Sequence, residues 1–323
     1  MKLIGIDIGG TKCAVCFGET DGKGGVNMQS AAAPRKTEGV KPEEMLRLLA
    51  EDVETLVSGE KERPAAVGIS CGSPMDSKRG IILSPPNLPG WDHVEITAFF
   101  EKNFGIPAYL CNDANAGALA EWRMGAGRGF RNIIFMTFGT GLGAGLILNG
   151  ALYEGASDCA GEIGHIRLKE SGPVGFGKEG SFEGFCSGGG IRQLAEIFVK
   201  EELKNGGHPS FCPTLEDLKK LSAETVGNAA KKGDPLAVRI MSESGEKLGE
   251  GLSVLIDVLN PERIIIGSIF TRCYDELWPA AEKVIRKETL PGARNACRVV
   301  PSSLTENVGN IAALVTAAYR MGQ

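Results

Sequence analysis

Residues 3–19, LIGIDIGGTKCAVCFGE, contain a strand-like run, a short turn of glycine, threonine and lysine, and a second strand-like run. Residues 132–150, NIIFMTFGTGLGAGLILNG, repeat this order of strand, glycine-rich turn and strand. The recurrence of one unit about halfway along the chain predicts two related halves. We expect each half to contribute one hairpin to a shared cleft; the alternative is two unrelated hairpins.

Strand-like and helix-like segments alternate between and after these two units. Residues 41–57 have apolar residues at helical spacing and Pro42 near the start, which predicts an amphipathic helix. Further strands are predicted over residues 65–72, 106–112 and 263–269, and further helices over residues 113–125, 237–260 and 310–321. This alternation predicts an α/β architecture, and a chain of 323 residues predicts two domains. Residues 169–190 are so rich in glycine that we expect no regular element there.

The composition argues against several classes of partner. A formal net charge of −5 and a pI near 5.5 give no general attraction to nucleic acid or to an anionic membrane. No apolar run approaches the length of a membrane span, and the N-terminus shows no signal-peptide pattern. The nine cysteines are scattered, so we expect reduced thiols, with Cys13 and Cys16 packed in a strand rather than binding metal. These features predict a cytoplasmic protein without nucleic-acid or membrane partners.

The first glycine-rich turn has the residue types of a phosphate site. Gly9 and Gly10 allow backbone N–H groups to approach an anion, and the Thr11 hydroxyl can donate to a phosphate. Asp7, at the end of the preceding strand, can hold a hydrated Mg²⁺ ion, and Lys12 completes the motif. The alternative interpretation is an ordinary hairpin turn.

The second turn, with Gly139, Thr140 and Gly141, repeats the pairing of glycine with threonine. Its spacing could also pass as a dinucleotide-binding fingerprint, with Glu162 as the acid that binds the ribose. That fingerprint must open a helix, however, and residues 144–150 resemble a strand followed by a turn. Neither turn fits the P-loop pattern. We therefore expect the two turns to form a two-part phosphate clamp.

Asn112 and Asp113 stand where a predicted strand ends and a predicted helix begins. Asn and Asp are common N-cap residues, so one interpretation is purely structural. The other is a carboxylate at the carboxyl end of a strand, aimed into the cleft where α/β proteins usually bind ligands. The two interpretations are compatible, because a capping residue could turn its other oxygen to a substrate hydroxyl and act as a base.

Glu162 and His165 lie three residues apart between glycines. A lone histidine is more often a structural group. A histidine beside a carboxylate, however, offers the mixed donors and acceptors that sugar hydroxyls need. Glu183, in the glycine-rich stretch, reads by itself as a solvated surface charge.

Taken together, six motifs resemble, in order, those of the ROK family of sugar kinases and sugar-responsive regulators, which have the actin-like ATPase fold. The resemblance covers nearly the whole chain. The motifs are IGIDIGGTK (4–12), SPPNLPGW (84–91), CNDANAGALAEW (111–122), TFGTGLGAGLILNG (137–150), GEIGH (161–165) and LIDVLNPERIIIGS (255–268).

The resemblance implies a duplicated, RNase H-like α/β fold with two domains around a cleft for ATP and sugar. The smaller domain would hold residues 1–112 plus 304–323, and the larger would hold residues 113–303 and a homodimer contact. The implied activity is ATP-dependent phosphorylation of a hexose hydroxyl, with Asp113 as the general base and Mg²⁺ held by Asp7 through water. The implied sugar contacts are Asn87, Asn112, Asp113, Glu162, His165 and Glu183. The implied nucleotide contacts are Asp7, Gly9, Gly10, Thr11, Lys12, Gly139, Thr140, Gly141 and, near adenosine, Gly267.

The chain departs from the family pattern after the histidine. Family members usually carry three cysteines there that bind a structural zinc, whereas residues 174–183 read VGFGKEGSFE. We therefore expect no structural zinc, since such sites need Cys or His donors. We expect Val174, Phe176 and Phe182 to pack together in its place, and a hydrogen bond to orient the His165 ring.

Two other functions fit parts of this pattern. A sugar-sensing transcriptional regulator of the same family would carry a winged helix ahead of the first turn, but that motif begins at residue 3, so we expect no DNA-binding module. Another actin-like ATPase, such as an acyl kinase, would lack the joint sugar motifs. Within the kinases, an N-acetylhexosamine substrate is the alternative to glucose, which is the substrate that we favour.

Overall fold

The computed structural model describes residues 1–304 and 308–322, and the chain folds into two compact units. Unit 1 consists of Met1–Arg131, Gly145–Ala160 and Ser303–Gln323. Unit 2 consists of Asn132–Ala144 and Gly161–Ser302. Both units combine strands with helices, which confirms the predicted α/β class. The domain boundaries predicted from the sequence, at 112/113 and 303/304, stay a prediction.

Unit 1 is built on a six-stranded sheet. Its strands are β1 (Lys2–Ile8), β2 (Lys12–Thr20), β3 (Val26–Ala31), β4 (Arg35–Lys36), β5 (Ala66–Cys71) and β9 (Ala108–Asn112). They lie in the order β3-β2-β1-β5-β9, with β4 also paired to β2. The β1–β2 pair is antiparallel, which confirms the first predicted hairpin, while β1, β5 and β9 are parallel. The register aligns Asp7 with Ser70 and Cys71 with Asn112, so these three strands end at one edge.

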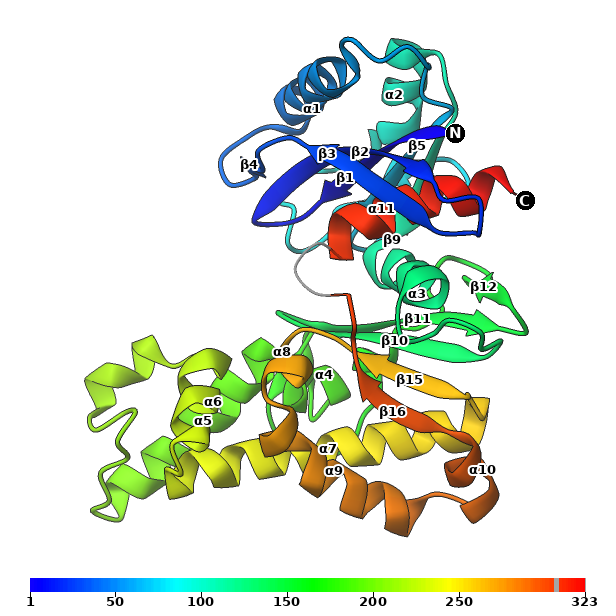
Figure 1. The fold of residues 1–323 in the computed structure, drawn as a ribbon. Coiled ribbons are helices and arrows are strands. Elements are labelled where there is room, and N and C mark those ends of the chain that lie inside the picture. Colours follow the sequence, from blue (N-terminus) through cyan, green and yellow to red (C-terminus); the bar gives the residue numbers. More distant parts are fainter. Residues whose placement is uncertain (305–307, 323) are drawn as a thin grey trace. The chain divides into compact units, whose positions relative to one another are not determined.

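The two faces of this sheet carry different helices (Figure 1). α1 (Pro42–Val57) and α2 (Ile96–Phe104) cover one face, over a core that includes Ile4, Ile6 and Ile8. α11 (Val308–Met321) covers the other face. Because side chains alternate along a strand, Asp7 points to the face of α11. A side chain added at Gly309, in the first turn of α11, would indeed meet the Asp7 carboxylate.

α11 lies directly on the sheet because β5 has no side chain where the helix crosses it. A Cβ atom at Gly68 would lie 2.7 Å from the backbone nitrogen of Ala317 and closer still to the Ala313 carbonyl oxygen. The helix is apolar on this side, with Ala312, Ala313, Leu314, Val315 and Ala317 buried. The first sheet and the last helix of the described chain are therefore one packing unit.

The remaining elements of unit 1 flank its functional residues. α3 (Asp113–Met124) follows β9 directly. A small sheet is formed by β6 (Met75–Asp76), β7 (Ile81–Ile82) and β8 (Val94–Glu95). The loop over residues 84–91 joins β7 to β8, and Leu88 and Trp91 anchor it because both are only 1% exposed.

The second sheet contains β10 (Ile133–Phe138), β11 (Leu142–Leu148), β12 (Ala151–Tyr153), β15 (Arg263–Ile266) and β16 (Arg298–Pro301). Its order is β12-β11-β10-β15-β16, so β10 and β11 are neighbours joined by the second glycine turn, as predicted. β10, β15 and β16 are parallel, and they are the strands that unit 2 contributes in full. The chain passes from unit 2 to unit 1 within β11, between Ala144 and Gly145.

Unit 2 holds most of the helices. These are α4 (Phe182–Phe185), α5 (Gly188–Lys204), α6 (Ala223–Lys231), α7 (Pro235–Leu259), α8 (Ile269–Arg272), α9 (Tyr274–Glu288) and α10 (Pro291–Ala296), with 3₁₀ turns η1 (Ile163–His165) and η2 (Leu215–Lys220). The expectation of no regular element over residues 169–190 was wrong. That stretch contains the hairpin of β13 (Val174–Gly175) and β14 (Lys178–Glu179), α4, and the start of α5. Ser181 and Ser187 cap the two helices, which lets glycine-rich sequence begin them.

Two further observations bear on the composition. All nine cysteines are free, and eight of them are buried, as expected of core thiols. Among the helices of residues 1–304 and 308–322, none combines the length and apolar character that a membrane crossing needs.

Candidate functional site

The first glycine turn is held in place by the strand that follows it. Gly9 N donates to Lys12 O at 3.0 Å and closes the turn. Thr37, which directly follows β4, also holds the turn: its hydroxyl donates to Gly9 O at 2.6 Å and its backbone N donates to Thr11 O at 3.1 Å. Thr11 and Lys12 are exposed, so both side chains are accessible to a ligand.

Asn87 lies against this turn. The loop of residues 84–91 brings the Asn87 backbone so near that a Cβ atom at Gly10 would lie 2.8 Å from Asn87 Cβ and closer still to its carbonyl oxygen. The structure thus brings a predicted phosphate residue next to a predicted sugar residue.

Gly10→Ala is expected to destabilise the protein by about 1–3 kcal/mol, because Asn87 must move away from the added methyl group. Chemical denaturation measures this change. Gly292→Ala, in α10, is the control, since no atom lies within 4 Å of its added methyl, and it should be neutral or slightly stabilising. If Gly10→Ala unfolded like the wild type, the close packing of Asn87 on the turn would be wrong.

Asp7 is the carboxylate nearest to this turn along β1. Burial and, after it, the neighbouring Asp113 carboxylate raise its pKa to about 6, although a hydrogen bond from Ser70 and the charge of Lys12 act in the opposite direction. The electrostatic link to Asp113 shows that the strand register has brought these two carboxylates together. A site with two nearby carboxylates and a single lysine attracts a cation.

Asn112, and not Asp113, is the N-cap of α3. Its side-chain oxygen accepts from Ala114 N at 2.9 Å and from Asn115 N at 3.2 Å, and its amide nitrogen donates to the Ser73 hydroxyl at 2.8 Å. Asp113 is the first residue of the helix, and its Oδ1 also accepts from Ala114 N, at 2.7 Å. Because the helix is capped by its neighbour, the Asp113 carboxylate has no indispensable structural task.

The surroundings of Asp113 favour its protonated form. Desolvation by the protein atoms around its carboxylate raises its pKa, and the hydrogen bond from Ala114 N opposes this rise. The residue nevertheless keeps solvent-exposed surface. A carboxylate with a raised pKa, on an exposed residue at the carboxyl end of a parallel strand, is suited to accept a proton from a bound hydroxyl.

The second glycine turn, in unit 2, is fixed by residues from the segment that includes α4 and α5. Gly188 N, at the start of α5, donates to Gly139 O at 2.7 Å. Glu183 Oε2 accepts from Leu142 N at 2.9 Å. The interpretation of Glu183 as a solvated surface charge was therefore wrong, because its carboxylate is partly buried and bound to the turn.

The structure places Glu183 beside the Glu162–His165 stretch. A Cβ atom at Gly164 would lie 3.2 Å from Glu183 Cβ. Glu162 and His165 are both exposed, on either side of the buried Ile163. Unit 2 thus gathers three of the predicted sugar contacts, while Asn87, Asn112 and Asp113 belong to unit 1. That the two groups meet in one site stays a prediction.

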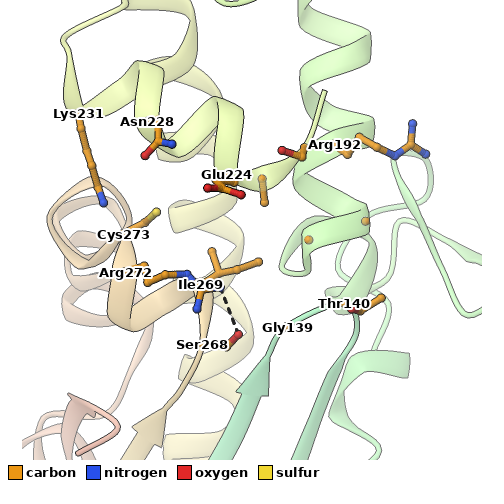
Figure 2. Close-up of a pocket in the computed structure, with 14 residues that line it drawn as sticks. Gly139, Thr140, Arg192, Glu224, Asn228, Lys231, Ser268, Ile269, Arg272 and Cys273 are labelled. Carbon is orange, nitrogen blue, oxygen red and sulfur yellow. Dashed lines mark hydrogen bonds between the residues drawn. The ribbon is translucent and has the colours of Figure 1, made fainter. Parts of the chain in front are cut away.

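A pocket of about 680 Å³ lies within unit 2, next to the second glycine turn. Figure 2 shows its side chains, which come from the β10–β11 turn, α5, α6 with its cap Ser222, and residues 268–273, which include α8. The lining residues are Gly139, Thr140, Gly188, Gly189, Arg192, Ser222, Ala223, Glu224, Asn228, Lys231, Ser268, Ile269, Arg272 and Cys273. Arg192, Lys231 and Arg272 supply positive charge, and Arg272 Nη2 donates to Ser268 Oγ at 3.5 Å.

Sequence reasoning missed most of this pocket. It named Gly139, Thr140 and Gly267, and Gly267 immediately precedes the lining residue Ser268. Ser187, followed by three glycines and a helical pattern, is a recognisable signal for a helix N-terminus that can face an anion. Ser222 likewise marks the start of α6, but no local pattern indicates that α6 and α8 lie beside the turn, because only the tertiary fold brings them there.

The segment that lacks the family's cysteines is organised differently from our expectation. Phe182 is fully buried, but Val174 is 45% exposed and Phe176 is 70% exposed, so the three side chains do not pack together. The hairpin of β13 and β14 points two of them outward. The expected hydrogen bond to the His165 ring is also absent among the described residues; Lys178 Nζ donates instead to the His165 carbonyl oxygen, at 2.7 Å.

The purified protein is expected to contain far less than one zinc per chain and to keep its melting temperature in the presence of a chelator. No three His, Cys, Asp or Glu side chains gather in a metal-binding group within residues 1–304 and 308–322, and a structural zinc needs four ligands. Elemental analysis after dialysis measures the metal. About one zinc per chain, lost together with stability on chelation, would contradict the expectation.

Two α/β units and two hairpins, each with a Gly-Thr turn, define the duplicated actin-like ATPase fold. The ROK family model matches residues 3–319, and the chain therefore belongs to the ROK family. It is 32% identical over 324 residues to the glucokinase of Thermotoga maritima, covering 100% of this chain and 99% of that protein. The fold is also similar to the crystal structure of a ROK family glucokinase from Streptomyces griseus in complex with glucose and AMPPNP. The TM-score is 0.77 and the sequence identity is 28%, and the match covers 99% of this chain and 100% of that one.

A relative with a different activity matches a shorter stretch. The xylose repressor of Caldicellulosiruptor bescii is 32% identical over 234 residues, which cover 71% of this chain and 57% of the repressor. The relatives of this chain thus include both a kinase and a repressor.

Proposed function

We propose that this protein transfers the terminal phosphoryl group of ATP to a hydroxyl of a hexose, with Asp113 as the general base. The observation that carries the proposal is the position of Asp113. The residue is exposed and follows a parallel strand, its carboxylate has a raised pKa, and Asn112 caps the helix in its place. A helix that already has a cap leaves this carboxylate available for chemistry.

The sugar would be bound by polar side chains from both units. Asn87 and Asn112 would contact it from unit 1, and Glu162, His165 and Glu183 from unit 2. Glu183 keeps one carboxylate oxygen on Leu142 N, so its other oxygen is the one that would accept from a sugar hydroxyl. Glucose is the substrate that we favour, because the relative from Thermotoga maritima is a glucokinase and the Streptomyces griseus structure contains glucose.

The nucleotide would occupy the pocket of unit 2. Asn228 and Ser268 offer hydrogen bonds for a base and a ribose, and Gly188 and Gly189 begin a 17-residue helix whose N-terminus favours phosphate. Arg192, Lys231 and Arg272 add the positive charge that a triphosphate requires. The volume and donor set of the pocket therefore fit ATP.

Asp7 is the residue that would hold magnesium, through water. Mg²⁺ is usually held by one or two carboxylates together with substrate phosphates rather than by a cage of protein ligands, which fits a site with only Asp7 and Asp113. When bound, ATP supplies the phosphoryl group and Mg²⁺ neutralises charge on its oxygens.

The residues of the chain would act by positioning and by moving one proton. Asp113 accepts the proton of the attacking hydroxyl as the new sugar O–P bond forms and the bond from the terminal phosphorus to the bridging oxygen of ADP breaks. The backbone N–H groups of the two glycine turns stabilise the charge on the transferred group.

A coupled assay of ADP release across a panel of hexoses and N-acetylhexosamines tests the proposal. ADP release that depends on an added hexose, with glucose giving the highest kcat/KM, is the expected result. ADP release that needs a carboxylic acid, or none with any sugar, would contradict it. The homodimer and the magnesium requirement belong to the same proposal and are measured by sedimentation and by metal titration.

The second candidate function is sugar sensing without phosphorylation, which the similarity to the xylose repressor favours. A sensor would bind a hexose in calorimetry and release no ADP. A kinase would do both, so the two measurements together separate the candidates.

A further inference from the structure

Phe176 occupies an unfavourable position that packing does not explain. It stands at the tip of the β13–β14 hairpin, where Phe176 and Gly177 have φ angles of 43° and 74°. Two positive φ angles in a two-residue hairpin are those of a type I′ turn, which favours Asn followed by Gly. A phenylalanine there is strained, and with 70% of its surface exposed it gains little from burial. Strain of this kind, kept in a fixed structure, points to a function.

The hairpin that carries Phe176 is fixed to α5 and to η1. The Gln193 side chain, on α5, accepts from Val174 N at 2.9 Å and donates to Val174 O at 2.8 Å, as a neighbouring strand would. On the second strand, Lys178 Nζ donates to His165 O at 2.7 Å. The hydrogen bonds of Gln193 and Lys178 therefore fix the position of the hairpin tip relative to His165.

The aromatic rings of Phe176 and His165 meet at this tip. Their centroids lie 6.3 Å apart and their planes are inclined by 76°, an edge-to-face arrangement. Among the described residues the His165 ring makes no hydrogen bond, which leaves the contact with Phe176 as the one that could restrict its rotation. A histidine that must present one nitrogen to a sugar hydroxyl needs such a restriction, because a freely turning ring loses entropy on binding.

We propose that Phe176 is a positioning residue that orients the His165 imidazole toward the sugar, and that the hairpin accepts backbone strain for this purpose. This inference rests on the proposed function. We expect Phe176 to contribute to the affinity for hexose. We expect it not to affect the affinity for nucleotide, because Phe176 does not line the pocket of unit 2.

Phe176→Asn is the decisive variant, because it has opposite effects on stability and on sugar binding. Asn tolerates the left-handed conformation, so the melting temperature should rise by about 2 °C. The loss of the ring contact should raise the KM for glucose about 3- to 10-fold. The KM for ATP should stay within about twofold. Phe176→Tyr, which keeps the ring, should bind glucose as tightly as the wild type does.

Leu215→Asn is the matched control, since it removes another exposed apolar side chain of unit 2, 62% exposed in η2. It should leave both KM values unchanged. Wild-type sugar kinetics in Phe176→Asn would overturn the inference, as would an equal loss in Phe176→Tyr or a parallel loss of ATP affinity. Failure of the proposed function is recognised separately, because the wild type itself would then release no ADP with any hexose. Calorimetric binding of glucose to the same variants tests the positioning role even in that case.

Discussion

Asp113→Asn is expected to lower kcat by about 10²–10⁴-fold, the usual contribution of a general base, while the fold and the affinity for sugar persist. Asparagine has a similar shape but cannot take up the proton of the attacking hydroxyl. The helix should survive, because the cap comes from the Asn112 side chain and not from Asp113. Steady-state kinetics with glucose, together with calorimetric sugar binding, measure the effect.

Asn112→Ala is the control for a merely structural role at this position. It removes the cap of α3 and should cost about 1 kcal/mol of stability. A stability loss in Asp113→Asn as large as in Asn112→Ala, with turnover near that of the wild type, would show that Asp113 is a helix-terminal residue and not the base.

Asp7→Asn is expected to lower kcat/KM about 100-fold or more and, at neutral pH, to stabilise the protein. The first effect follows from the loss of the carboxylate that would hold Mg²⁺. The second follows from the pKa of Asp7, which is about 6 in the folded protein against an ordinary value of 3.8. Between those two pH values the folded state binds more protons than the unfolded state, so wild-type stability falls as pH rises through this window and is level above it.

The difference in stability between Asp7→Asn and the wild type should therefore depend on pH. At pH 7, Asp7→Asn should be more stable than the wild type by about 2–3 kcal/mol, and below about pH 3 the two should be equal. Urea denaturation at a series of pH values measures this. A variant that is less stable than the wild type at pH 7 would contradict the electrostatic description of Asp7, and a variant with normal activity would contradict its role with magnesium.

The sequence predicted those parts of the fold that local patterns specify. The β1–β2 hairpin follows from alternating apolar residues around Gly9 and Gly10, and α7 follows from a long helical periodicity that the structure places at Pro235–Leu259. It did not predict α5, α6 or α9. The start of α5 lies in a glycine run, which has low helix propensity, and the helix forms there because Ser187 caps it and the rest of it packs in the core.

In the candidate site, too, local sequence patterns indicate some residues, and only the tertiary fold brings in the others. Asp7, Asn112 and Asp113 could be named because the ends of strands and the starts of helices are visible in the sequence. Phe176 was expected to pack with Val174 and Phe182 because all three are apolar, and the error arises from a turn whose two positive φ angles direct the Phe176 side chain outward. Lys231 and Arg272 of the pocket come from α6 and α8, and no local pattern indicates that these helices meet beside Gly139.

The packing of α11 on the first sheet has a consequence for the order in which the protein is made. The strands β1 and β5 leave the ribosome early, but the helix that covers the face of Asp7 and Gly68 is synthesised more than two hundred residues later. Unit 2 lies between them and can fold first. Until α11 emerges, the apolar face of the first sheet is open to chaperones or to aggregation. In a chain that ends at Ser302, unit 2 should therefore resist protease and unit 1 should not. This result would mean that the half carrying Asp7 and Asp113 matures last. Equal resistance in both units would disprove this order.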